Sequence, residues 1–211
     1  IAPSLVGSEM CIRDRVVSLS KYSIEDLDEG DSEDVQIYVV IPSSARSTDE
    51  ATITVTAESH DDTTAFADLE LISKVNTVYN QYVTASTVPV MYPGDSSQFN
   101  ISITNSGNSI ESYKFSEGAN VPDGWKFEDT LIFETQELDP YGGVEAFVLP
   151  FEIPQDQNPG YYNFTINVKL SSSGIRVQTL DLSVKVEYYA DFTLDVVPTE
   201  SSGDPGFTHL L

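Results

Sequence analysis

The sequence predicts an all-β chain of antiparallel β-sandwiches in tandem, one complete and two partial. Three observations carry this prediction. Short runs alternate apolar and polar residues, turn-forming residues separate the runs, and the whole pattern recurs after about 110 residues. No sustained helical period interrupts the runs.

Alternation of period two is clearest in three runs, 98–104 (QFNISIT), 163–170 (NFTINVKL) and 180–186 (LDLSVKV). Successive side chains of a strand point to opposite faces, so each run predicts a strand with one buried face. The residues that we expect to be buried are Phe99, Ile101, Ile103, Phe115, Phe147, Leu149, Phe164, Ile166, Val168, Leu180, Leu182 and Val184.

Turn-forming sequences separate these runs, and the resulting short strands predict a two-sheet sandwich of seven or eight strands. The turns are expected at Pro93-Gly94-Asp95, Asn105-Ser106-Gly107-Asn108, Pro122-Asp123-Gly124, Gly142-Gly143, Asn158-Pro159-Gly160 and Ser173-Gly174.

An internal repeat sets the expected domain boundaries. Pro42 matches Pro154 (154 − 42 = 112), and Ile53 matches Phe164 (164 − 53 = 111). A near-constant offset at apolar positions indicates copies of one unit of ordinary domain size. We therefore expect the C-terminal half of a sandwich at 16–75 (the first copy), a complete sandwich at 76–187 (the complete copy) and the start of a third at 188–211.

The first copy is expected to keep the strand order and register of 138–187, with strands near 16–19, 33–41, 51–58 and 65–75. Without a front half, its apolar residues should have too few partners. We expect the copies to fold independently, so that deleting residues 1–75 leaves the unfolding midpoint of the complete copy nearly unchanged.

Residues 4–15 (SLVGSEMCIRDR) resemble the translated end of a transposase-type sequencing adapter. The run from Leu5 to Asp14 matches one reading frame of that adapter without a mismatch. Such segments are excluded from fold reasoning, so residues 1–15 are expected to be artefactual and unstructured, and the chain to be a fragment.

Composition narrows the function classes. The chain has 34 acidic and 10 basic residues, for a net charge of −24, whereas phosphate binding needs clustered Lys and Arg. No apolar run reaches the length of a membrane span. The only cysteine, Cys11, lies in the adapter-like segment. We expect no nucleic-acid partner, no membrane span within the chain, and neither a disulfide nor a thiolate site.

The order of motifs in the complete copy resembles a known module. Pro93-Gly94 precedes a strand that ends in 104–108 (TNSGN), followed by 122–125 (PDGW), 138–140 (LDP) and 159–161 (PGY). This order resembles the Ig-like domains associated with alpha-galactosidases and with cell-adhesion-related repeats of prokaryotic surface proteins. The resemblance implies tandem Ig-like sandwiches in an extracellular, cell-surface protein.

The chain offers little for catalysis, because its only histidines are His60 and His209. His60 lies in 58–62 (ESHDD) between two expected strands. A Ser-His-Asp triad needs spatial convergence and an orienting shell, which a solvated hairpin tip does not supply. We expect no catalytic residue and no enzyme activity.

The acidic run 26–34 (DLDEGDSED) raises the question of a calcium site, because hard cations take several carboxylates from one tight turn. The spacing departs from the EF-hand pattern, with Gly30 where a third ligand should stand. The matching loop of the complete copy, DPYGGVE, lacks these acids. We expect a solvated turn, with no metal and no cofactor.

Four aromatic residues allow two interpretations. Trp125, Tyr113 and the outward-facing member of the pair Tyr161-Tyr162 could form a platform for sugar rings. A lone tryptophan in such a module more often packs on the core edge with its N–H satisfied, and this is the interpretation that we favour.

Two N-glycosylation sequons begin at Asn100 (NIS) and Asn163 (NFT). Each asparagine precedes an apolar residue that should point inward, so period-two alternation places both asparagines on the solvent face. Both are candidate modification sites.

These observations favour a non-catalytic spacer or adhesion segment of a large secreted or cell-surface protein. Its expected partners are neighbouring repeats of the same chain, together with a cell-surface polysaccharide or protein. The alternative is a polysaccharide-binding accessory module of a secreted glycoside hydrolase or peptidase, acting through the aromatic platform. A β-sandwich hosts both functions, so a catalytic domain encoded next to this segment would favour the second.

Overall fold

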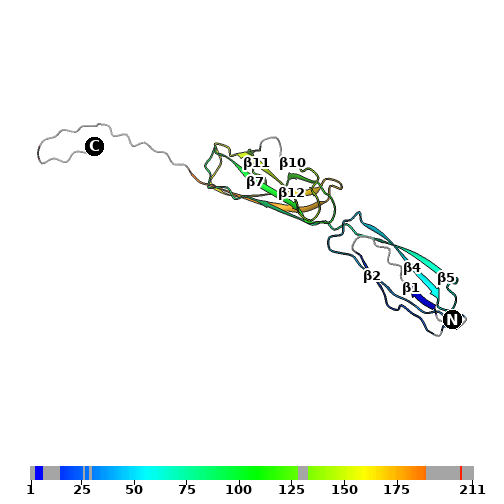
Figure 1. Cartoon of the computed structure of the whole chain (residues 1–211). Helices are drawn as coiled ribbons and strands as arrows, with labels where there is room; N and C mark the ends of the chain where they lie inside the picture. Colours follow the sequence, from blue (N-terminus) through cyan, green and yellow to red (C-terminus); the bar gives the residue numbers. More distant parts are fainter. Residues whose placement is uncertain are drawn as a thin grey trace.

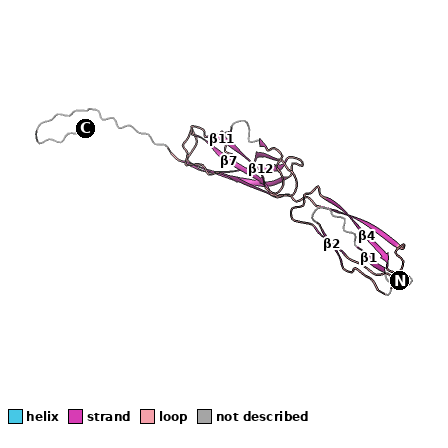
Figure 2. Cartoon of the chain, in the orientation of Figure 1, coloured by secondary structure: helices cyan, strands magenta, loops and turns pink. Residues whose placement is uncertain are grey.

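The computed structural model describes residues 3–6, 15–25, 27–28, 30–127, 133–188 and 205. Within these ranges all regular structure is β-strand (Figure 2), and no helix there is long and apolar enough to cross a membrane. The strands form two units that lie end to end (Figure 1). The predicted all-β fold is confirmed.

In its described residues, 76–127 and 133–187, the complete copy is a sandwich of eight strands. They are β6 (Gln81–Ala85), β7 (Ser96–Asn105), β8 (Tyr113–Glu117), β9 (Lys126–Phe127), β10 (Phe133–Glu134), β11 (Gly143–Glu152), β12 (Gly160–Leu170) and β13 (Arg176–Val186).

Two antiparallel four-stranded sheets make up this sandwich, in the orders β6-β7-β11-β9 and β10-β8-β12-β13. The first matches the A-B-E-D sheet of a constant-type Ig domain, and β8-β12-β13 matches its C-F-G sheet, with the short β10 beside β8. An isolated parallel bridge from Met91 to Val186 joins the segment after β6 to the end of β13.

The core fills the space between the two sheets. Eleven of the twelve residues predicted to be buried are so, and Phe147 is partly buried. Phe147 lies toward the β10 side, where its ring stacks on that of Phe133 with the centroids 3.9 Å apart. Residues 128–132, which precede β10, lie outside the described part.

The first copy contains two smaller sheets. Strands β2 (Val16–Leu19) and β3 (Ile37–Val40) form one, and β1 (Pro3–Val6), β4 (Glu50–Ser59) and β5 (Phe66–Lys74) form the other in the order β1-β4-β5.

The two copies share one register in their last hairpin. Ile53 pairs with Leu71 in the first copy, and Phe164 pairs with Leu182 in the complete copy. Both residues of the pair shift by the same interval (164 − 53 = 111 and 182 − 71 = 111). The predicted register is confirmed for this hairpin.

The expectation that residues 1–15 are unstructured is wrong for Pro3–Val6, which pair with Thr56–Ser59 of β4. In the complete copy, β8 occupies the matching edge of β12, at Ile166–Leu170. The described residues from 15 to 75 supply no such strand, so the edge of β4 would otherwise present unpaired N–H and C=O groups. An extended segment from elsewhere in the chain satisfies them. Residues 7–14 lie outside the described part.

The hairpin of the first copy is also less well covered than that of the complete copy. Leu69 of β5 is 54% exposed, whereas Leu180, at the same place in the complete copy (180 − 69 = 111), is 7% exposed. The difference follows from the opposing layer, since β2 and β3 have four residues each. Apolar area therefore stays in contact with water.

Candidate functional site

Trp125 belongs to the core edge of the complete copy. Its side chain is 7% exposed, its ring stacks on Phe151 with centroids 5.4 Å apart and an interplanar angle of 5°, and Phe164 meets it edge-on. The indole Nε1–H donates to Oε1 of Gln157 at 2.8 Å. The core-packing interpretation is confirmed, and the sugar-platform interpretation is wrong for Trp125 because the ring is covered.

Tyr162 forms a tyrosine corner at the start of β12. Its hydroxyl donates to the backbone carbonyl of Asn158, four residues upstream, at 2.6 Å, and accepts from Nε2 of Gln157. The ring also packs against Trp125 at a tilt of 46°. This geometry is a recognised feature of Ig-type sandwiches. Tyr162 therefore closes the loop between β11 and β12.

Tyr113 is buried at the start of β8 and is 1% exposed. Its hydroxyl donates to Oδ1 of Asn105 at 3.2 Å. The sugar-platform interpretation is wrong for Tyr113 too, because alternation in β8 points this ring into the core. Burial, with a smaller contribution from the negative charge of Glu111, raises the pKa of Tyr113 to about 12.

Alkaline pH is expected to destabilise the complete copy through Tyr113. Its folded pKa lies above the ordinary value of 10.0, so the folded state holds the phenol proton more tightly than the unfolded chain does. The resulting stability is fully present below about pH 10 and is lost as the pH rises toward about 12. Urea midpoints followed by the fluorescence of Trp125 should fall across this range. Tyr113→Phe should show a smaller fall, and equal falls in both proteins would assign the effect to other groups.

Of the four aromatic candidates, Tyr161 is the one that the structure leaves in solvent, with 71% of its surface exposed. The ammonium of Lys185 lies 5.9 Å from its ring centroid. Adjacent positions of β12 point to opposite faces, so Tyr162 is turned inward and Tyr161 outward. The structure does not bring the four rings together on one surface.

Both sequon asparagines are exposed on the solvent face, which confirms their predicted placement. Asn100 lies on β7 opposite Val148 of β11, and Asn163 lies on β12 opposite Ser183 of β13. The two sites therefore lie on the outer faces of different sheets. Their modification stays a prediction.

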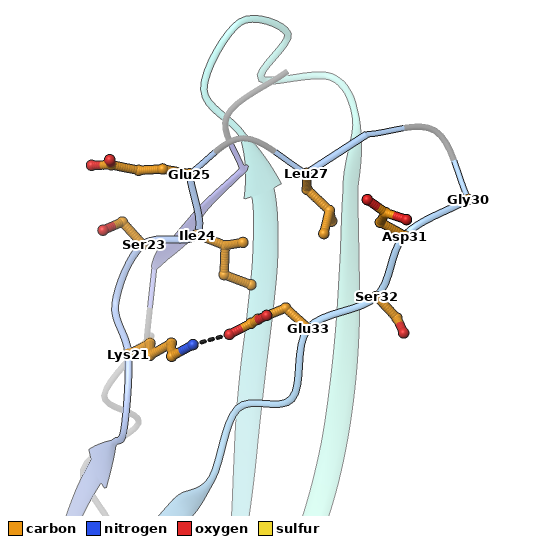
Figure 3. Close-up of a pocket in the computed structure, with 9 residues that line it drawn as sticks. All are labelled: Lys21, Ser23, Ile24, Glu25, Leu27, Gly30, Asp31, Ser32 and Glu33. Carbon is orange, nitrogen blue, oxygen red and sulfur yellow. Dashed lines mark hydrogen bonds and ion pairs between the residues drawn. The ribbon is translucent and has the colours of Figure 1, made fainter.

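The acidic loop of the first copy forms a shallow cavity that is open to solvent (Figure 3). Ile24 and Leu27 point into it, Glu25 points away, and Lys21 forms an ion pair with Glu33. The described acids of the loop are exposed, as a solvated turn requires. Among the described residues, no group of three or more His, Cys, Asp or Glu could hold a metal ion. Asp26 and Glu29 lie outside the described part.

His60 is exposed at the β4–β5 hairpin, with its Nδ1 3.4 Å from a carboxylate oxygen of Asp61. His60 is a solvated loop residue, and no buried side chain in the described part of the chain fixes the orientation of its ring. Its contact with Asp61 therefore does not make a catalytic triad. His209 lies outside the described part.

The turn after β7 holds a polar network that the sequence indicated only as a turn. Asn105 is 0% exposed, and its Nδ2 donates to the carbonyls of Ser109 (2.8 Å) and Leu138 (3.0 Å). Its Oδ1 accepts from the backbone N–H of Gly107 and from the hydroxyl of Tyr113. All the hydrogen-bonding groups of this amide are thus occupied inside the protein.

This turn and the turn before β11 contact the preceding copy, and sequence reasoning missed both contacts. Ser47 donates its N–H to the carbonyl of Asn108 at 3.0 Å, and the hydroxyl of Tyr141 donates to the carbonyl of Ala45. One feature of the sequence could have indicated the Tyr141 contact. An aromatic residue stands directly before Gly142-Gly143, in a turn where small residues are usual. This contact between copies is the strongest candidate for a functional surface in the described part of the chain.

No family model and no curated protein sequence matches the chain. Among solved structures, the chain is similar to a family 123 glycoside hydrolase from Clostridium perfringens, with 14% identity and a TM-score of 0.34, over 52% of this chain and 28% of that one. It is also similar to domains 4 and 5 of the S-layer protein SbsC, with 10% identity and a TM-score of 0.30, over 82% of this chain and 98% of that one. Likenesses at these TM-scores carry no functional argument.

Proposed function

We propose that this chain is a non-catalytic spacer or adhesion segment, made of tandem Ig-like copies, in a large secreted or cell-surface protein. The observation that carries the proposal is the repeated hairpin, with one register in two copies joined directly in tandem. Each complete copy has its own hydrophobic core. A chain of such copies can therefore hold its two ends at a fixed distance without a binding or catalytic site. The motif order supports the alpha-galactosidase-associated and cell-adhesion-related type of module.

The charge of the chain supports an extended segment. A net charge of −24 makes neighbouring surfaces repel each other and opposes collapse of the array onto itself. The same field disfavours nucleic acid as a partner. The partners that fit a spacer are adjacent copies of the same chain and a protein of the cell surface, whereas saturable binding of a polysaccharide would favour the alternative below.

Two measurements on the whole chain test this function. Small-angle scattering should show an elongated particle, and pull-down on insoluble polysaccharides should show no saturable binding. A compact particle in buffer of physiological salt would contradict the spacer, because a spacer has to stay extended where salt screens most of the surface repulsion.

The alternative, a polysaccharide-binding accessory module, now depends on the exposed ring of Tyr161 beside Lys185. If saturable binding is found, Tyr161→Ala should abolish it, because aromatic rings stack on the apolar faces of sugars. Tyr82→Ala is the matched control, since Tyr82 is also exposed but lies on β6 of the other sheet. Binding that survives Tyr161→Ala would remove this residue from the alternative.

A further inference from the structure

The linker between the two copies is hydrogen-bonded along its length. The N–H of Val75 donates to the carbonyl of Asp49 at 3.2 Å, and the N–H of Ser106 donates to the carbonyl of Asn80 at 2.8 Å. A flexible linker would leave these groups to water. Here one end of the linker is tied to the first copy and the other to the complete copy.

Asn108 holds the middle of the linker. Its side chain donates from Nδ2 to the carbonyl of Asn76 at 2.9 Å and accepts at Oδ1 from the N–H of Val78 at 2.8 Å. Its backbone N–H donates to the carbonyl of Val78 at 3.2 Å. Asn108 is buried, so water does not compete easily for these bonds.

Gly107 lets the linker approach closely. A Cβ at this position would lie 2.5 Å from the carbonyl oxygen of Val78 and 3.1 Å from the backbone nitrogen of Asn80. Any side chain would therefore push the linker away from the turn. The glycine is required here by the space that the linker occupies.

Tyr141 reaches the first copy from a backbone conformation that bulky residues rarely adopt, with φ at +61°. Two turn bonds hold it there, from its own N–H to the carbonyl of Gly107 at 3.0 Å and from the N–H of Gly142 to the carbonyl of Asn105 at 2.8 Å. Such conformations persist where the surroundings enforce them, and they gather at functional sites. In this position the hydroxyl of Tyr141 donates to the carbonyl of Ala45, which is a buried residue.

We propose that turns 105–109 and 139–142 of the complete copy form a docking surface for the preceding copy of the chain. This surface holds the 42–49 loop of the preceding copy and the 75–80 linker in one orientation. The inference deepens the proposed spacer function, on which it rests. The linker is one attachment, and Ser47 and Tyr141 provide two more, so a swing at the joint must break bonds between the copies. The array would then have a set direction as well as a set length.

Distances between spin labels on the two copies test the orientation. Labels at Thr52→Cys on β4 and Ser183→Cys on β13, both exposed positions, are attached to the whole chain carrying Cys11→Ser. Pulsed electron spin resonance should give one narrow distance distribution. The double variant Asn108→Ala with Tyr141→Phe should broaden it severalfold, and Tyr141→Phe alone should broaden it less.

Tyr161→Phe is the matched control, because it removes an exposed tyrosine hydroxyl far from the joint and should leave the distribution narrow. The fluorescence of Trp125, the only tryptophan, shows whether the complete copy of each variant stays folded. A broad distribution in the parent chain, or a narrow one in a folded double variant, would overturn the proposal. Neither result tests the proposed spacer function itself. The scattering and polysaccharide measurements test that function separately.

The docking surface also changes what deletion of residues 1–75 should do. The sequence alone predicted an unchanged unfolding midpoint for the complete copy. Deletion removes the partners Ala45 and Ser47 but keeps the linker from Asn76 onward. We now expect the midpoint reported by Trp125 to fall by a few degrees, and an unchanged midpoint would contradict the docking surface.

Discussion

Ile166→Asp is expected to unfold the complete copy. Ile166 is 2% exposed at the centre of β12, between β8 and β13, and alternation points its side chain into the apolar core. A carboxylate there would have neither a hydrogen-bond partner nor an opposite charge, at a cost of several kcal/mol. The whole stability of a small domain is about 5 to 15 kcal/mol. Most molecules should therefore be unfolded or close to it.

The measurement is thermal or urea unfolding followed by Trp125 fluorescence, which reports on this copy alone because the chain has a single tryptophan. Asn163→Asp is the matched control. It introduces the same residue on the same strand at an exposed position, and it should change stability by no more than about 0.5 kcal/mol. A native unfolding midpoint for Ile166→Asp would mean that the faces of β12 are assigned the wrong way round.

Asn105→Leu is expected to destabilise the complete copy by about 3 to 5 kcal/mol. The substitution keeps an apolar stem of similar size but removes four hydrogen bonds, those with Ser109, Leu138, Gly107 and Tyr113. The N–H and hydroxyl groups left behind are buried, and each buried polar group without a partner costs about 1 to 3 kcal/mol. The carbonyl of Leu138 suffers less because the N–H of Glu111 still donates to it at 3.2 Å.

Urea unfolding with an unchanged m-value would show this loss as a lower midpoint. Asn100→Leu is the control, since Asn100 lies on the same strand with its side chain exposed, and it should cost no more than about 0.5 kcal/mol. A loss below about 1 kcal/mol for Asn105→Leu would mean that water or a shifted turn replaces the amide. The polar network would then be incidental to the fold.

Local information in the sequence determined the fold class, the repeat interval and the buried face of each long strand. Alternation along β7, β12 and β13 assigns side chains to a face without any knowledge of the partner strand, because the period of a strand is two residues. Apolar positions in the repeat also carry the hairpin register, since a shift of one residue would expose every buried side chain. Solvent exposure of Asn100 and Asn163 follows from the same rule.

Tertiary structure alone decided what the polar and aromatic turn residues do. Period-two alternation assigns Tyr113 to a face but does not say that a second sheet covers that face, and Trp125 lies in a turn where no period applies. The pairing of Pro3–Val6 with β4 depends on an edge that no other described strand of the first copy occupies. The bonds from Asn105 to Leu138, from Asn108 to Asn76 and from Tyr141 to Ala45 join residues 33, 32 and 96 positions apart. Such contacts depend on how whole elements come together, and for that physical reason the joint between the copies could not be read from the sequence pattern.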